Sequence, residues 1–176
     1  WTPHRPQRAW EKLEGGRRFL WMSERDGYAQ LHLCELSGAC RAVTQGPWIV
    51  DGRVSFSGSQ PGFVLDERTG FAYFSATEKD ARERHLYRIR LDGTGRTRLT
   101  REDGTHRCVV APDGRFYADT WSDVATPPRA WVSSQDGTRR FTLEANESPE
   151  ILKFERGSLE WVALKAADGT PLHASL

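Results

Sequence analysis

Serine and histidine are the residues of this chain that could provide nucleophilic catalysis. A serine nucleophile held on a strained strand-to-helix turn requires the sequence Gly-x-Ser-x-Gly, which the chain does not contain. The nearest sequences, Ser57-Gly58-Ser59 and Ser37-Gly38, both fall in expected hairpin turns. No Asp and His at the ends of expected strands stand in the order that a catalytic triad requires. The five dispersed histidines are His4, His32, His85, His106 and His173. We therefore assign no catalytic residue.

Two of the three cysteines flank a predicted hairpin turn. A three-residue loop at Leu36–Gly38 places Cys34 and Cys40 directly opposite each other on neighbouring strands, close enough for a disulfide. Two reduced, partly buried thiols are the alternative, and Cys108 has no evident partner. These spacings supply too few ligands for a metal site. We predict neither a metal nor a cofactor.

An internal repeat decides how two of the histidines are interpreted. Residues Phe19–Asp26 align with Tyr73–Asp80, 54 positions later, through an aromatic start and a shared pattern of Ser or Thr, Glu, a basic residue and Asp. Further along this alignment, His32 falls on His85. Because residues that repeat at matching positions are more often structural than catalytic, we interpret both histidines as part of the repeat's own packing.

The repeat unit predicts an antiparallel meander. Phe71–Thr77, His85–Leu91 and Arg96–Thr100 are rich in aromatic or alternating apolar residues, which favour strands. Asp92-Gly93-Thr94-Gly95 is a hairpin turn, because glycine tolerates positive φ, and Glu78–Arg84 is a charged loop. Repeats of this kind are typical of a β-propeller, whose blades are four-stranded meanders of roughly 40–50 residues. We expect an all-β fold of about two to three blades in an incomplete ring.

The rest of the chain supplies further short strands separated by Gly, Pro and Asp turns. We expect no helix of ordinary length. The other expected strands lie near Arg8–Leu13 and at Arg17–Ser23, Leu31–Leu36, Arg41–Thr44, Trp48–Val50, Arg53–Ser57, Gly62–Asp66, His106–Ala111, Arg115–Trp121, Arg129–Ser134, Arg139–Leu143, Leu152–Glu155 and Leu159–Lys165.

Composition agrees with a soluble, β-rich domain. The 176 residues include 25 basic and 24 acidic side chains, whereas a nucleic-acid or membrane surface would favour a basic face. No segment approaches the roughly 20 apolar residues of a membrane span. The seven tryptophans suit packed sheet interiors or an aromatic groove, and we favour packing because aromatic residues favour strands. The chain begins at Trp1 without a methionine, so we expect an excised piece of a longer protein.

Several short motifs, taken in order, resemble those of one enzyme family. They are Trp21–Gly27, Thr44–Trp48, Tyr73–Glu78, His85–Tyr87 and the turn from Leu91 to Thr100, continued by Asp119, Ser122 and Pro127-Pro128. Over Phe19 to Trp131, the chain resembles the last propeller blades of dipeptidyl peptidase IV-like enzymes, in the prolyl oligopeptidase family of serine peptidases. Each motif alone is common in propellers, so their order and spacing carry the resemblance.

The resemblance implies a parent enzyme that releases N-terminal dipeptides, preferably after proline or alanine, from peptide substrates. Its propeller restricts substrate access and docks a separate peptidase domain, so the fragment itself is inert. Such enzymes bind the substrate ammonium through adjacent glutamates, and no Glu-Glu pair occurs here. Glu24 and Glu78 repeat at matching positions, which favours turn hydrogen bonds over binding. The family favours a periplasmic or extracellular location.

The resemblance also divides the chain. We expect residues 1–148 to form C-terminal blades and residues 149–176 to cross into the start of an α/β-hydrolase peptidase domain. The expected partners are that missing domain and the upstream blades. Self-association is also expected, through apolar faces that carry Trp21, Phe74 and Tyr87. The alternative is a non-enzymatic propeller that binds a peptide or sugar, and the reading frame after Leu176 distinguishes the two.

Overall fold

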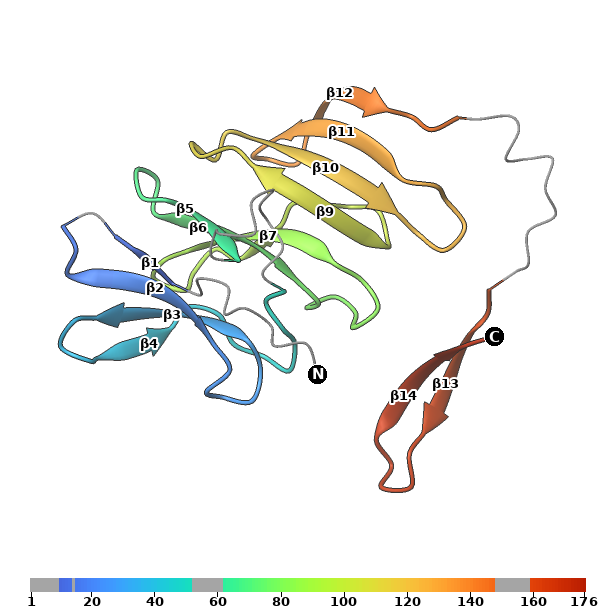
Figure 1. Ribbon diagram of the computed structural model, residues 1–176, viewed down its shortest axis with the longest axis horizontal. Helices are drawn as coiled ribbons and strands as arrows, with labels where there is room; N and C mark the ends of the chain where they lie inside the picture. Colours follow the sequence, from blue (N-terminus) through green and yellow to red (C-terminus); the bar gives the residue numbers. More distant parts are fainter. Residues whose placement is uncertain (1–9, 14, 52–61, 148–158) are drawn as a thin grey trace, which may run out of the picture.

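Three four-stranded sheets and one hairpin make up the fold. The computed structural model describes residues 10–13, 15–51, 62–147 and 159–176, and its regular elements there are all β-strands. All the sheets are antiparallel. In Figure 1 the three larger sheets lie side by side in chain order, with the hairpin as a separate unit beside them. The prediction of an all-β fold built from antiparallel meander blades is confirmed.

The strands of each blade follow one another in the chain. Blade 1 contains β1 (Trp10–Lys12), β2 (Arg18–Ser23), β3 (Gln30–Glu35) and β4 (Cys40–Ala42). Blade 2 contains β5 (Phe63–Asp66), β6 (Phe71–Ala76), β7 (His85–Arg90) and β8 (Thr97–Arg98). Blade 3 contains β9 (Thr105–Val110), β10 (Phe116–Ser122), β11 (Arg129–Ser134) and β12 (Arg139–Glu144). The hairpin pairs β13 (Trp161–Lys165) with β14 (Pro171–Ser175). The strands expected at Arg53–Ser57 and Leu152–Glu155, and the start of the one near Arg8, lie outside the described residues.

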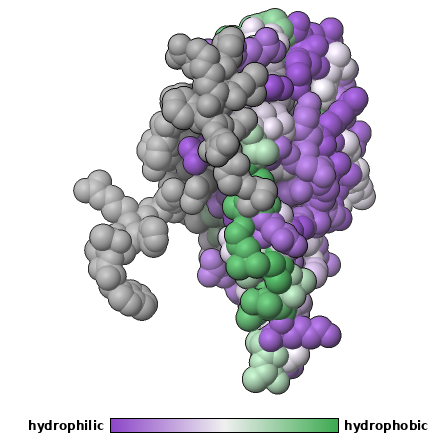
Figure 2. All heavy atoms as spheres, turned by 90° about the vertical axis from the view of Figure 1, so that its right-hand side faces the viewer, coloured by the Kyte–Doolittle hydropathy of each residue, from purple (hydrophilic) through white to green (hydrophobic). Residues whose placement is uncertain are grey.

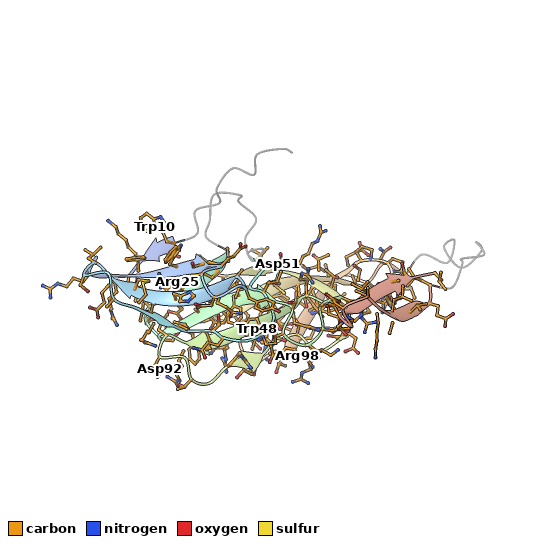
Figure 3. All side chains as sticks on the ribbon, turned by 90° about the horizontal axis from the view of Figure 1, so that it is seen from below. Trp10, Arg25, Trp48, Asp51, Asp92 and Arg98 are labelled. Atoms are coloured by element: carbon orange, nitrogen blue, oxygen red, sulfur yellow. A yellow bond between two sulfur atoms is a disulfide. The ribbon has the colours of Figure 1, made fainter. Side chains whose placement is uncertain are left out.

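The segment Trp48–Val50 is not a strand, contrary to the prediction. Pro47 has no N–H to donate to a ladder, and Val50 makes only an isolated bridge to Ala76. Gly46 lets the Trp48 ring come close, since a Cβ on this glycine would lie 2.1 Å from Nε1. The ring stacks on Phe74 of β6, with centroids 6.3 Å apart. Trp48 therefore fills the space between blades 1 and 2, where Figure 3 labels it among the strands.

Most of the hydrophobic core lies between neighbouring blades. Leu20 and Leu31 of blade 1 belong to one cluster with Phe74 and Tyr87 of blade 2. Phe74 and Tyr87 are 0 % and 2 % exposed, so the prediction that they line an exposed face is wrong. Blade 1 covers them, and of the three aromatic residues named for that face only Trp21 remains partly exposed.

A disulfide links the last two strands of blade 1. Cys34 and Cys40 are register partners on β3 and β4, and their Cα atoms lie 4.0 Å apart. The Glu35 amide donates to the Ala39 carbonyl (2.8 Å), which closes the predicted three-residue turn. The structure thus has the disulfide rather than two thiols. Cys108 is free and buried.

Candidate functional site between blades 2 and 3

Most residues that the sequence singles out for chemistry lie far from one another. Ser37 is exposed in the β3–β4 turn, where its hydroxyl donates to Glu35 (3.3 Å). His173 lies on β14 in the hairpin. Ser57, Ser59 and His4 fall outside the described residues. The structure therefore assembles no nucleophile, base and acid from the candidates that it describes.

The two repeated glutamates share no site either. Glu24 is exposed in the loop between β2 and β3. Glu78, after β6, forms an ion pair with Arg96 (2.9 Å) in the same blade. The contact of Glu78 agrees with a structural role.

One threonine in each of the first two blades shows which residues are equivalent. The Leu31 amide donates to Thr44 Oγ1 (2.8 Å), and the Leu86 amide donates to Thr100 Oγ1 (3.2 Å). Leu31 and Leu86 therefore occupy the same place, as the second residues of β3 and β7. The sequence alignment places Leu33 on Leu86 and is wrong by two residues. A shift of two keeps every side chain on the same face of its strand, so alternation could not reveal it.

His32 and His85 are consequently not equivalent. His85 corresponds to Gln30, and His32 corresponds to Tyr87. Both histidines are nevertheless buried, 2 % and 0 % exposed, and His32 Nε2 lies 3.0 Å from Asp26 Oδ2. Their interpretation as structural residues is supported by these contacts, although the reason given for it was not correct.

A group of buried polar side chains lies between blades 2 and 3. We call it the histidine cluster, and it consists of His85, Thr100, His106, Cys108 and Asp119. The rings of His85 and His106 have centroids 5.1 Å apart. His106 and Cys108 alternate on β9, and Asp119 of β10 is the register partner of Cys108. Three strands and the segment after β8 thus meet at this point.

His106 lies between two groups that only accept hydrogen bonds. Its Nδ1 is 2.8 Å from Asp119 Oδ2, and its Nε2 is 2.8 Å from the Glu102 carbonyl oxygen. A neutral imidazole carries one N–H, so both contacts are hydrogen bonds only when both ring nitrogens are protonated. His106 and Asp119 thus form a buried pair, which is an ion pair when the imidazole carries both protons.

Cys108 also faces the Asp119 carboxylate. Its sulfur lies 3.4 Å from Asp119 Oδ1. Burial raises the pKa of the Cys108 thiol, and the negative charge of Asp119 acts in the same direction. Because the thiolate is the nucleophilic form, this cysteine is unreactive in the folded chain. The histidine cluster contains a thiol, a histidine and a carboxylate. The carboxylate lies against both of the other groups, so the three side chains pack the blades together and do not form a nucleophile beside its base.

The contacts of His85 suit a neutral ring. Its Nε2 is 2.8 Å from Glu83 Oε2, which accepts, and its Nδ1 is 3.0 Å from Thr100 Oγ1, which can donate. One hydrogen, on Nε2, satisfies both contacts. Burial lowers the pKa of His85; the hydrogen bond to Glu83 opposes this shift, and the charge of His106 reinforces it. The neutral form of His85 is thus favoured beside the ring of His106.

The lowered pKa of His85 predicts a pH dependence of stability. An unfolded histidine has a pKa of about 6.5, so the unfolded chain takes up the proton first as the pH falls. The contribution of His85 is therefore complete above about pH 6.5 and is lost below it. We expect His85→Gln, which copies Gln30 of blade 1, to reduce this loss by at most about 1.4 kcal/mol per pH unit. Urea unfolding between about pH 7.5 and pH 5 measures it, and parallel curves for the two proteins would contradict it.

A polar cavity of about 320 Å³ adjoins the histidine cluster on one side. Thr100, Asp119 and Trp131 contribute to its wall. The Arg139 guanidinium lies 3.6 Å from the centre of the Trp131 ring and 2.6 Å from Glu102 Oε1. Arg139, one of the two arginines in the cavity wall, is thus already paired.

A second polar cavity, of about 270 Å³, lies on the other side of His106. Ser75, Arg84 and Arg107 contribute to its wall. The Arg84 Nε donates to Asp51 Oδ2 (2.8 Å), and its Nη1 donates to the carbonyls of two loop residues. Arg84 in this cavity and Arg139 in the first cavity thus each bind a neighbouring segment of the chain.

Within residues 10–13, 15–51, 62–147 and 159–176, no group of three or more His, Cys, Asp and Glu side chains could hold a metal ion. Over the described part of the chain, no helix has the length and hydrophobicity of a transmembrane segment.

The histidine cluster was missed by the sequence analysis, although part of it could have been found. A hairpin centred on Asp113-Gly114 places Asp119 opposite Cys108, two residues from His106 on the same face. The turn Pro112-Asp113-Gly114 is a strong signal for that hairpin. The pairing with His85 depends on how blade 2 lies against blade 3, and no local pattern reports that.

Residues 1–128 match a family model described as the dipeptidyl peptidase IV (DPP IV) N-terminal region. The chain is 28 % identical over 152 residues to a Schizosaccharomyces pombe protein named as a dipeptidyl aminopeptidase, covering 82 % of this chain and 18 % of that protein. It is 33 % identical over 107 residues to an Emericella nidulans protein named as dipeptidyl-aminopeptidase B, covering 60 % of this chain and 11 % of that protein.

A solved structure shows the same arrangement. The crystal structure of Porphyromonas gingivalis dipeptidyl peptidase 4 superposes with a TM-score of 0.75 and 27 % identity, covering 95 % of this chain and 23 % of that chain. The chain thus spans less than a quarter of the length of each of these three proteins.

Proposed function

The chain belongs to the family of dipeptidyl peptidase IV N-terminal regions, and from this we propose that it forms the propeller blades next to a peptidase domain. These blades restrict the access of peptide substrates and dock that domain. The whole protein releases N-terminal dipeptides, preferably after proline or alanine, through a serine nucleophile in the peptidase domain. The 176-residue chain alone has no turnover.

The β13–β14 hairpin is the observation that carries this proposal. It forms a two-stranded sheet of its own, separate from the described strands of the blades. One face presents Val162, Leu164, Leu172 and Ala174, and the two leucines are 49 % and 46 % exposed. Figure 2 shows hydrophobic residues gathered on this side of the molecule, where the hairpin lies. A lone two-stranded hairpin is marginally stable in water, so we assign the cover of this face to the peptidase domain.

The opposite face of the hairpin contacts blade 2. The Arg82 guanidinium, in the loop between β6 and β7, lies 5.2 Å from the centre of the Trp161 ring. The same guanidinium bonds to Asp80 (2.7 Å), which holds it in place. We propose that residues 1–148 are blades and residues 149–176 begin the peptidase domain, at the end of blade 2 that carries this loop.

The disulfide supports a location outside the cytoplasm. Cys34 and Cys40 are bonded, and disulfides persist mainly in oxidising compartments. We assign the whole protein to the periplasm or the extracellular space.

Activity measurements test the proposal. The whole protein is expected to cleave a Gly-Pro-anilide and to lose this activity after treatment with a serine-directed phosphonate. Residues 1–176 are expected to show no cleavage, because a nucleophile, a base, an orienting carboxylate and an oxyanion hole must be held together. Inhibitor-sensitive turnover by the 176-residue chain would contradict the proposal. A whole protein without a serine elbow would instead favour a non-enzymatic propeller.

Two neighbouring residues of the hairpin provide a matched pair of variants in that experiment. In the whole protein, Leu164→Asp places a charge on the aliphatic face, where burial is costly, and is expected to lower the rate of dipeptide release by about tenfold or more. Ala163→Asp places the same charge on the opposite face of the strand and serves as the control. Equal rates for the two variants would argue against docking through this face.

A further inference from the structure

A basic cavity lies where blades 2 and 3 meet the loop between β6 and β7. It is the cavity of about 270 Å³ beside His106, and its wall includes three arginines, Arg82, Arg84 and Arg107. Among the described residues of the wall, Asp51 alone carries a carboxylate. Arg82 and Arg107 are exposed, so solvent reaches this part of the wall. An excess of arginine in a cavity favours an anionic ligand.

Two of the arginines are held in place by carboxylates. Arg82 donates to both oxygens of Asp80, from Nε (2.9 Å) and from Nη2 (2.7 Å). Arg84 donates from Nε to Asp51 (2.8 Å) and from Nη1 to two loop carbonyls (3.0 and 2.9 Å). A guanidinium has five N–H groups, and no described residue accepts a hydrogen bond from Arg82 Nη1 or Arg84 Nη2. Both side chains therefore keep unused donors in a fixed position.

Arg107 supplies the positive charge that is not neutralised. Arg82 and Arg84 each have a carboxylate partner, at 2.7 and 2.8 Å. Arg107 lies on β9 and is exposed, and it forms no ion pair with any residue that the structure describes. The wall therefore keeps a net positive charge, which an incoming anion would neutralise.

A buried hydroxyl group also belongs to the wall. Ser75 of β6 is 4 % exposed and lines the cavity. It lies two residues from Tyr73, on the same face of the strand, and Tyr73 packs in one cluster with Cys108 of blade 3. Within the described part of the chain, the Ser75 hydroxyl makes no hydrogen bond. Because buried polar groups are generally hydrogen-bonded, we expect the partner of this hydroxyl to lie in the cavity.

The cavity lies on the side of blade 2 that contacts the β13–β14 hairpin. Arg82 lies 5.2 Å from the centre of the Trp161 ring on β13, and this hairpin is assigned above to the peptidase domain. A peptide that passes between the blades and that domain therefore reaches this wall. The cavity of about 270 Å³ suits one side chain, since pockets for whole small molecules measure about 300–1,000 Å³.

We propose that this cavity binds a carboxylate of the peptide substrate, on an acidic side chain downstream of the released dipeptide. Arg84 and Arg107 provide charge-assisted hydrogen bonds, and Ser75 donates its hydroxyl hydrogen. The inference rests on the proposed function, because it takes peptides as the substrates. It goes further by assigning a preference for Asp or Glu beyond the cleaved bond.

Kinetics of the whole protein test the inference. The substrates are peptides that begin with Gly-Pro, end in an amide and carry Glu at one downstream position, each matched with its Gln analogue. At one of these positions we expect kcat/KM for the Glu peptide to exceed that for the Gln peptide by about tenfold, as for one charge-assisted contact. The ratio is expected to fall as the ionic strength rises. Equal values for Glu and Gln at every position would overturn the inference.

Two arginine variants show whether this cavity causes the preference. Arg107→Gln removes the charge that is not neutralised and is expected to lower the ratio of Glu to Gln rates about fivefold or more. Arg98→Gln is the control, because Arg98 is an exposed arginine of β8 that does not line the cavity. It is expected to keep the ratio. Equal reductions in the two variants would indicate an effect of net charge and would overturn the assignment to this cavity.

Ser75→Ala separates binding from stability. Because the Ser75 hydroxyl has no partner among the described residues, its removal is expected to leave Tm unchanged or to raise it slightly. The same substitution is expected to lower the ratio of Glu to Gln rates by about threefold. A lower Tm with an unchanged ratio would show that the hydroxyl serves packing, and would contradict its place in the site.

NMR spectra of the isotope-labelled 176-residue chain test the site without turnover. The Glu peptide is expected to shift the amide resonances of Ser75 and Arg107, and the Gln analogue is expected to leave them in place. These shifts, in a protein that releases no dipeptides, would keep the site and overturn the proposed function. Equal rates for Glu and Gln peptides, in a whole protein that does release dipeptides, would overturn the site alone. Shifts caused by inorganic phosphate but by neither peptide would assign the cavity to a small anion and overturn the inference.

Discussion

Replacing Asp119 with alanine is expected to destabilise the 176-residue chain by about 3–5 kcal/mol, because it breaks a buried ion pair from one side. The Asp119 side chain is 1 % exposed and that of His106 is 0 % exposed. Without the carboxylate, Nδ1 of His106 loses its hydrogen-bond partner at the junction between blades 2 and 3. Urea unfolding at constant pH measures the change.

Asp113 offers the control for this substitution. Its side chain is 41 % exposed and pairs with Arg115 (2.5 Å) in the β9–β10 turn, so Asp113→Ala is expected to change stability only slightly. The double variant Asp119→Ala with His106→Ala is expected to be clearly less unstable than the sum of the two single variants. Additive effects, or an Asp119→Ala variant as stable as Asp113→Ala, would show that the pair does not hold the blades together.

Replacing Gly137 with alanine is expected to loosen blade 3 from blade 2. The left-handed conformation at φ +82° costs a residue with a side chain about 1–2 kcal/mol. The methyl group would also lie 2.7 Å from the Leu99 carbonyl oxygen, which accepts from the Tyr117 hydroxyl (3.2 Å) and cannot move without weakening that bond. Overpacking of this kind adds about 1–3 kcal/mol, so the total loss is about 3 kcal/mol.

Two comparisons separate the steric clash with the Leu99 carbonyl oxygen from the free-energy cost of the left-handed backbone conformation. Gly38→Ala changes the corresponding β3–β4 turn of blade 1, at φ +93° and with no atom of the described residues within 4 Å of the new Cβ, and is expected to lose only the backbone part. Cys108, buried at the junction of blades 2 and 3, is the free thiol of the chain. We expect Gly137→Ala, but not Gly38→Ala, to speed its reaction with a thiol reagent. Identical rates and stabilities for the two variants would refute a clash at this junction.

Strands and turns could be predicted because they depend on neighbouring residues. Arg129–Ser134 was expected as a strand and forms β11 with the same bounds. Asp92-Gly93 makes the expected turn because glycine alone takes φ +89° without strain. The placement of Cys34 opposite Cys40 also depends on neighbouring residues, since a three-residue turn sets the register of its hairpin.

Local patterns failed where a distant group decided the outcome. Trp48–Val50 has the composition of a strand, but Trp48 packs on Phe74 of another blade. The repeat alignment placed His32 on His85, although threonine hydrogen bonds show a shift of two residues. Both errors arise because composition and alternation describe a strand's two faces and not what lies against them.

By itself, then, the sequence of this protein determined most of its strands, its turns, the register that places Cys34 opposite Cys40, and its family, all of which follow from residues close in the chain or from their order along it. Only the tertiary structure decided which apolar faces are covered, burying Phe74 and Tyr87 and leaving Trp21 partly exposed. It also decided the lowered pKa of His85, because the pKa of a ring depends on its burial and on the donors and acceptors around it. Those groups come from different strands, and from two blades, whose contact no alternation pattern specifies.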